Sequence, residues 1–212
     1  MTVTLSEYDL PDAFLFSGGT TGILAWQPQE TIIVLGQSNS IESSLYTETV
    51  AADGIRVTKR PSGGETVILT PATIAFTVAK QFPVMIQFRE FFSMVNSEVM
   101  EGLADMGVTG LGSKGISDIT IGNRKILGSS MRKVGSKLVY HAVLNVSQDP
   151  LLFGRYLCHP RREPDYRAGR RHDEFVTSIA NEGYNIKPAD LMSMLNRQLG
   201  GLMVSQPSFK KH

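Results

Sequence analysis

The chain has 212 residues, of which 42% are hydrophobic and 19% are charged, enough apolar material for one large domain with a full core. Its formal net charge of +1 favours neither nucleic acid nor an anionic membrane as a partner. No apolar run approaches the roughly 20 residues of a membrane-spanning helix, and the N-terminus lacks the order of a signal peptide. The single cysteine, Cys158, fits a reducing compartment, so we expect a cytoplasmic protein.

The first third of the chain predicts short buried strands around polar turns. Residues 8–25 mix aromatic residues with glycines and predict no clear element. Apolar runs predict strands at 31–35, 55–60, 65–69 and 74–78, with a helix from Glu42 to Ala52 between the first two.

The loop between the second and third predicted strands combines a base, a hydroxyl and two glycines. Arg60 is followed by Pro61, Ser62, Gly63 and Gly64. Glycines allow backbone N–H groups to converge on an anion, and an arginine adds a forked contact. The loop is therefore a candidate anion cradle, and a turn chosen only for its backbone angles is the alternative.

The segment from Gly115 to Ser130 predicts a hairpin that carries one lysine. Isoleucines alternate with polar residues on both sides of Gly122-Asn123, a usual short hairpin connector. Lys125 begins the second strand, and the small residues that follow it allow a ligand to come close. A fixed lysine beside such a surface stabilises a phosphate or a developing oxyanion. An ordinary surface hairpin with a solvated lysine is the alternative.

The remaining patterns predict helices, one clear strand and a basic loop. Apolar residues at three-and-four spacing predict an amphipathic core helix over 88–106. We further expect a strand at 138–146, with His141 as a packed or hydrogen-bonded residue, and helices at 151–157, 173–179 and 188–199 before a frayed tail at 205–212. The most basic segment, 158–172, predicts a loop whose arginines form a docking surface for an acidic partner or a solvated face: Arg161, Arg162, Arg167, Arg170 and Arg171.

Several segments, in order, resemble the lipoate–protein ligase family, within the superfamily of biotin ligases and octanoyltransferases. The resemblance covers roughly residues 26 to 180. Its segments are Trp26-Gln-Pro, Ile32–Gly36, Gln37–Asn39 with Glu42, Val57–Gly64, Ser117-Asp-Ile, Arg124–Ser129, His141–Asn145 and Phe175–Ser178.

The resemblance implies an α/β (α+β) fold with a mixed, largely antiparallel sheet flanked by helices. The biotin/lipoate ligase-like catalytic domain is expected at residues 1–184, and a C-terminal helix and tail at 185–212 without a separate accessory domain. The implied reaction joins lipoate, through lipoyl-adenylate formed from ATP and Mg²⁺, to a lysine of a lipoyl carrier domain. Carriers of this type are a 2-oxoacid dehydrogenase subunit and the glycine cleavage H protein. A separate accessory subunit is a further expected partner.

The family pattern also implies roles for individual residues. Lys125 is the expected catalytic residue, contacting carbonyl and phosphate oxygens. Substrate-binding roles fall on Arg60, Ser62, Gly63 and Gly64 around the acyl carboxyl and phosphate, and on Ser117 and Asp118 on the nucleotide or magnesium side. No protein metal site is expected. An apolar tunnel for the eight-carbon chain is expected along Ile33, Leu35, Val67 and Ile126.

The sequence departs from the family pattern at Glu65, where a third glycine is usual. We expect this acid to face outward, because an inward carboxylate would repel phosphate. Two alternatives remain open. One is an octanoyltransferase in which Lys125 activates Cys158 as a thioester-forming nucleophile for octanoate. The other is a non-catalytic subunit that binds the acyl group or the carrier.

Overall fold

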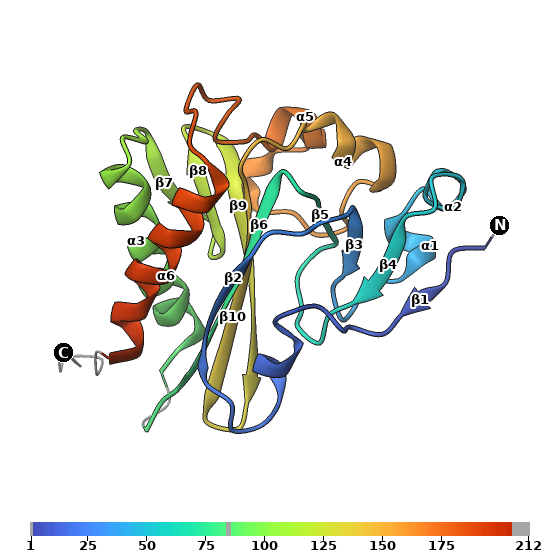
Figure 1. Cartoon of the computed structure of the whole chain (residues 1–212). Helices are drawn as coiled ribbons and strands as arrows, with labels where there is room; N and C mark the ends of the chain where they lie inside the picture. Colours follow the sequence, from blue (N-terminus) through green and yellow to red (C-terminus); the bar gives the residue numbers. More distant parts are fainter. Residues whose placement is uncertain (1, 84–85, 205–212) are drawn as a thin grey trace.

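A computed structural model describes residues 2–83 and 86–204 of the chain; the expected tail at 205–212 lies outside them. Two sheets form its framework (Figure 1). The larger sheet is antiparallel throughout, and the smaller one mixes parallel and antiparallel pairs. The expected mixed, largely antiparallel sheet is confirmed. In spatial order the larger sheet contains β2 (Gly22–Trp26), β6 (Thr73–Gln81), β10 (Lys137–Asn145), β9 (Arg124–Val134), β8 (Asp118–Ile121) and β7 (Leu111–Lys114), and the smaller contains β1 (Leu5–Ser6), β4 (Arg56–Lys59), β3 (Ile32–Leu35) and β5 (Val67–Leu69).

Two long helices cover one face of the larger sheet. Figure 1 shows α3 (Phe88–Asp105) and α6 (Pro188–Val204) beside each other on this face. Side chains at alternate positions of β10, such as Tyr140 and Leu144, pack into the core with both helices. The intervening positions reach the opposite face, where His141 lines a cavity. Within the described residues, no helix is both long and apolar enough to cross a bilayer.

The helix predicted from Glu42 to Ala52 is broken in two. It forms α1 (Ile41–Ser44) and α2 (Thr47–Ala52). Leu45 adopts an extended conformation between them and forms a β-bridge with Leu157, the last residue before the basic loop. This pairing fixes one end of the loop against the smaller sheet's helices. Periodicity along the chain does not reveal such a long-range contact.

The short C-terminal elements also depend on long-range contacts. The α-helix α4 (Leu151–Tyr156) and the 3₁₀-helix η2 (Asp165–Arg167) precede α5 (His172–Phe175), whereas the 3₁₀-helix η1 (Ala13–Phe16) lies near the N-terminus. The helix predicted over 173–179 is wrong, because the chain leaves α5 in an extended conformation at Val176. Val176 bridges Lys125, and Thr177 donates its N–H to the Lys125 carbonyl at 2.8 Å. These contacts hold the Lys125 main chain from a second side.

Candidate active site

A cavity of about 840 Å³ has walls from both sheets and from the loop at 158–171. This volume is within the usual range for small-molecule sites, roughly 300–1,000 Å³. One part of its wall is apolar and is formed mainly by Trp26, Val34, Leu69, Ala75, Phe76 and Val143. The rest carries the charged residues that the sequence singled out. A ligand with an apolar chain and an anionic head matches this division.

The expected acyl tunnel is only partly correct. Val67 lines the cavity, whereas Ile33 and Leu35 pack into the core below the smaller sheet and Ile126 packs under the long helices. Successive strand side chains point to opposite faces, so Val34 occupies the cavity wall in place of its two neighbours. The prediction therefore chose the residues on the wrong face of β3.

Lys125 lies at the cavity wall with a carboxylate partner. Its Nζ is 2.8 Å from Oδ1 of Asp118, and the Asp118 side chain is only 6% exposed. The second carboxylate oxygen accepts a hydrogen bond from Tyr166 of the basic loop at 2.8 Å. Ser117 and its hydroxyl flank the same carboxylate. Lys125, Ser117 and Asp118 therefore meet at the cavity, and their contacts with substrate stay predictions.

Gly128 provides the space that the Lys125 side chain occupies. A Cβ at position 128 would lie 2.6 Å from both Cε and Nζ of Lys125. Real Cβ atoms do not approach other atoms this closely, so any larger residue displaces the amine. The small residue after the lysine thus determines where the ammonium group is placed.

Arg60 organises the predicted anion cradle from within. It is 3% exposed, and its guanidinium donates to the carbonyl oxygens of Val34, Gly63 and Glu65 and to the Ser62 hydroxyl. Burial lowers the pKa of Arg60 to about 10, so the group stays charged at neutral pH. Its donors fix the loop shape, which is a different task from the forked contact to substrate predicted above.

The glycine loop packs tightly against Gly36, the residue that follows β3. Gly64 adopts a φ of +83°, and a Cβ on Gly36 would lie 1.9 Å from the Gly64 carbonyl oxygen. Both Arg60 and Gly64 line the cavity, whereas Ser62 and Gly63 are not among the lining residues. Direct contact of those two with substrate stays a prediction.

A neutral histidine supports the loop from β10. His141 Nε2 lies 2.5 Å from the Ser62 hydroxyl, and Ser130 donates to the Gly63 carbonyl at 2.8 Å. Burial, together with the charge of Arg60, lowers the pKa of His141 well below its usual 6.5. An unprotonated ring therefore positions Ser62, which agrees with the supporting role expected for this histidine.

Glu65 does not face outward as expected. It is half-buried, lines the cavity and accepts a hydrogen bond from the Asn39 side chain at 3.1 Å. Its negative charge raises the pKa values of two buried arginines, Arg60 and Arg167, and so opposes the effect of their burial. Neighbouring buried cations explain why the acid points inward.

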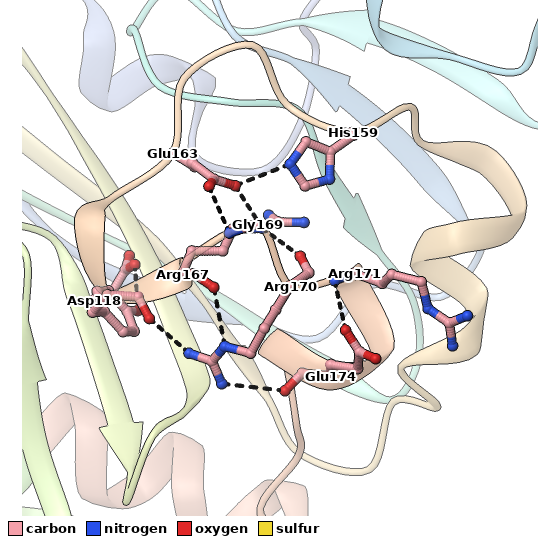
Figure 2. Close-up of polar contacts among 9 residues, drawn as sticks. Asp118, His159, Glu163, Arg167, Gly169, Arg170, Arg171 and Glu174 are labelled. Carbon is pink, nitrogen blue, oxygen red and sulfur yellow. Dashed lines mark hydrogen bonds and ion pairs between the residues drawn. The ribbon is translucent and has the colours of Figure 1, made fainter.

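The basic loop uses two of its five arginines as internal structure (Figure 2). Arg167 is 4% exposed, and Arg170 donates to the carbonyl oxygens of Tyr166, Arg167, Asn123 and Glu174. Composition alone predicted a single docking surface, which is wrong for these two residues. Three arginines remain exposed: Arg161, Arg162 and Arg171.

Cys158 lines the same cavity as Lys125 and is partly exposed. Its backbone N–H donates to the Ser44 carbonyl at 2.9 Å, which holds the first residue of the loop. Within the described residues, the thiol has no hydrogen-bonding partner, and the charged partner of Lys125 is Asp118. Cys158 thus lies at the cavity, but it does not pair with Lys125 in this structure.

Tyr166 and Glu163 were missed by sequence reasoning, and Arg167 was expected on a docking surface rather than in the cavity wall. Glu163 binds His159, Arg167 and the Gly169 N–H, and it thereby holds the loop in one shape (Figure 2). The only local signal was Tyr166, an aromatic residue among prolines and arginines. Such a pattern does not distinguish a loop that lines a cavity from a loop exposed to solvent. In the described part of the chain, no cluster of three or more histidine, cysteine or acidic side chains is arranged to hold a metal ion.

Lowering the pH is expected to destabilise the fold in part through His172. Burial and the charge of Arg167 lower its pKa from 6.5 to about 4. The unfolded chain therefore binds a proton that the folded chain does not, and this contribution is complete above about pH 6.5 and is lost as the pH falls towards about 4. Denaturant unfolding across this window should show a shallower pH slope for His172→Gln, and an unchanged slope would contradict the assignment.

Comparison with known proteins identifies the type of domain to which this fold and cavity belong. The family model of the lipoyl protein ligase A/B catalytic domain matches residues 16–200. The chain belongs to this family. The match continues past residue 184 into α6, which packs against α3.

The relatives span the bacteria and the archaea. A lipoate-protein ligase A of Blochmanniella pennsylvanica is 25% identical over 90% of this chain and 53% of its own length. A bipartite lipoate protein ligase of Thermoplasma acidophilum, studied with its E2 lipoyl domain, has a TM-score of 0.73 and 16% identity over 84% of this chain and 69% of that one. A lipoate-protein ligase A bound with ATP has a TM-score of 0.74 and 17% identity, covering 94% of this chain and 84% of that one. The chain spans about half the length of the curated relative.

Proposed function

We propose that this chain transfers a lipoyl group from lipoyl-adenylate to a lysine of a carrier domain. The observation that carries the proposal is the Lys125 amine, fixed by Asp118 at the wall of a cavity that also has an apolar section. An acyl-adenylate combines an apolar chain with an anionic head, which are the two features that this cavity matches. Family membership supports the same activity.

The chemistry needs no protein nucleophile. In the first half-reaction the lipoate carboxylate attacks the α-phosphate of ATP, forms a mixed anhydride and releases pyrophosphate. In the second, the carrier amine attacks the acyl carbonyl and releases AMP and a proton. Both steps concentrate negative charge on oxygen, which a fixed ammonium and preorganised N–H donors stabilise. Lys125 supplies the ammonium, and the Gly64 loop supplies main-chain donors.

Magnesium belongs to this scheme as part of the ATP substrate. The Asp118 carboxylate already accepts from Lys125 and Ser117 on one oxygen and from Tyr166 on the other. Mg²⁺ is commonly held by substrate phosphates with only one or two carboxylates. We therefore assign Asp118 to the lysine and leave the ion to the nucleotide.

The partners we propose are a lipoyl carrier domain and an accessory subunit. The archaeal ligase of similar fold is bipartite and was studied with its E2 lipoyl domain. The exposed arginines, Arg161, Arg162 and Arg171, are the proposed contacts for an acidic carrier in a reducing cytoplasm.

Carrier lipoylation measured by intact mass tests the activity. With preformed lipoyl-adenylate the chain is expected to add one lipoyl group to a carrier domain, and Cys158→Ser is expected to keep that rate within about twofold because the proposed route uses no thiolate. Adding lipoate and ATP instead shows whether the chain also forms the adenylate alone. Absence of transfer from the adenylate, with a folded carrier present, would contradict the proposal.

An octanoyltransferase is the second candidate, and the position of Cys158 in the cavity wall favours it. That mechanism transfers octanoate through a thioester on Cys158. It predicts an acyl-enzyme mass with an octanoyl donor and no activity in Cys158→Ser. Carrier binding without transfer from either donor would instead indicate a non-catalytic subunit.

A further inference from the structure

Arg167 is a buried cation in the cavity wall. It ends η2 and is only 4% exposed. The following residue, Ala168, adopts a left-handed conformation with φ of 51°, which turns the chain back over the arginine. A charged side chain in such a position requires partners on each side.

Protein contacts satisfy one edge and one face of this guanidinium. Its Nε donates to the Arg170 carbonyl at 2.9 Å and lies 3.3 Å from a Glu163 carboxylate oxygen. Its plane lies over the Phe175 ring, with 4.8 Å from Cζ to the ring centroid. The terminal Nη2 is buried and has no hydrogen-bonding partner within the described residues. The Arg167 residue lines the cavity, so a ligand bound there lies beside this guanidinium.

Unsatisfied polar atoms gather around this cavity. Four buried side-chain atoms have no partner in the described part of the chain, and three belong to residues that line the cavity: Trp26, Thr66 and Arg167. Native proteins leave few such atoms, and a cluster at one cavity indicates that a ligand completes them. Among the three, only Arg167 carries charge.

We propose that Nη2 of Arg167 binds an oxyanion of the substrate in the cavity. The chemistry that fits is a carboxylate or a phosphate, because a guanidinium has only donors and its fork matches both groups. The two sources are the acyl carboxylate and the α-phosphate of its adenylate. This assignment deepens the proposed function and rests on it.

Glu163 gives the arginine a fixed orientation and a competing charge. By holding Nε, its carboxylate leaves Nη2 free for the ligand. A guanidinium oriented before binding loses less side-chain entropy when the ligand arrives. The same carboxylate lowers the positive potential that an incoming anion meets.

Calorimetric titration of two matched ligand pairs tests the assignment. AMP is compared with adenosine, and octanoate with octanamide, in wild type, Arg167→Gln and the control Arg171→Gln from the same loop. The Arg171 side chain is 73% exposed and lies outside the cavity. Arg167→Gln is expected to reduce the preference for the anion by roughly 10- to 100-fold in at least one pair, leaving the neutral ligand unaffected. The pair affected identifies the oxyanion.

Glu163→Gln provides a second test that does not remove the buried arginine. An amide oxygen can still accept from the Gly169 N–H, but the competing charge is gone. Anion affinity is expected to rise by roughly threefold or more, because the Arg167 cation is less neutralised. Unchanged preferences in both variants, or a wild type without preference for either anion, would overturn the inference. Carrier lipoylation by the wild type decides the proposed function separately.

Discussion

Replacing Lys125 with alanine is expected to lower the rate of lipoyl transfer from preformed lipoyl-adenylate by roughly 10²- to 10³-fold. In the proposed mechanism the ammonium is the charged donor at the reacting oxygens, and losing one such donor removes about 3 kcal/mol of transition-state stabilisation. The fold is also expected to lose stability, because the buried Asp118 carboxylate loses its cation. Single-turnover transfer and thermal unfolding measure the two effects.

A double variant separates the two effects. Asp118→Asn in the Lys125→Ala background removes the unpaired charge and keeps an acceptor for Tyr166. Stability is expected to recover while transfer remains slow. If activity returned together with stability, Lys125 would be a structural residue and the proposed mechanism would be wrong.

Gly128→Ala is expected to lower transfer by displacing the Lys125 amine. The new methyl group would lie 2.6 Å from the end of the Lys125 side chain, which is flexible and moves aside. The amine then leaves its position beside Asp118, while the strand pairing of β9 is retained. Transfer is therefore expected to fall by at least roughly tenfold, with thermal unfolding within a few degrees of wild type.

Gly112→Ala on β7 is the matched control for this substitution. A Cβ there meets only the Thr120 hydroxyl at 3.5 Å, an ordinary contact. This variant is expected to keep both activity and stability. Full activity in Gly128→Ala would show that the amine functions from more than one position.

The hairpin and the glycine loop were predictable because their signals are local. Gly122-Asn123 and alternating isoleucines determine the turn around Lys125, and the base followed by paired glycines marks the loop at Arg60. The ordered family segments added the fold and the reaction type. The hairpin and the loop agree with the structure because each depends on the types and spacing of a few consecutive residues.

Features that depend on distant contacts were not predictable. Five arginines look alike in composition, and only the three-dimensional path of the loop buries Arg167 under Phe175. Strand parity at Val34 likewise depends on which face of β3 meets the cavity. The inward position of Glu65 depends on cations elsewhere in the chain.

One carboxylate joins the Lys125 ammonium to the basic loop. The Asp118 carboxylate accepts from Lys125 and Ser117 on one oxygen and from Tyr166 on the other, so its negative charge is divided among three donors. Without the Tyr166 hydroxyl, more of the carboxylate charge would be available to the ammonium and would bind it more firmly. The Tyr166 contact therefore leaves the ammonium with more positive charge to offer a ligand in the cavity.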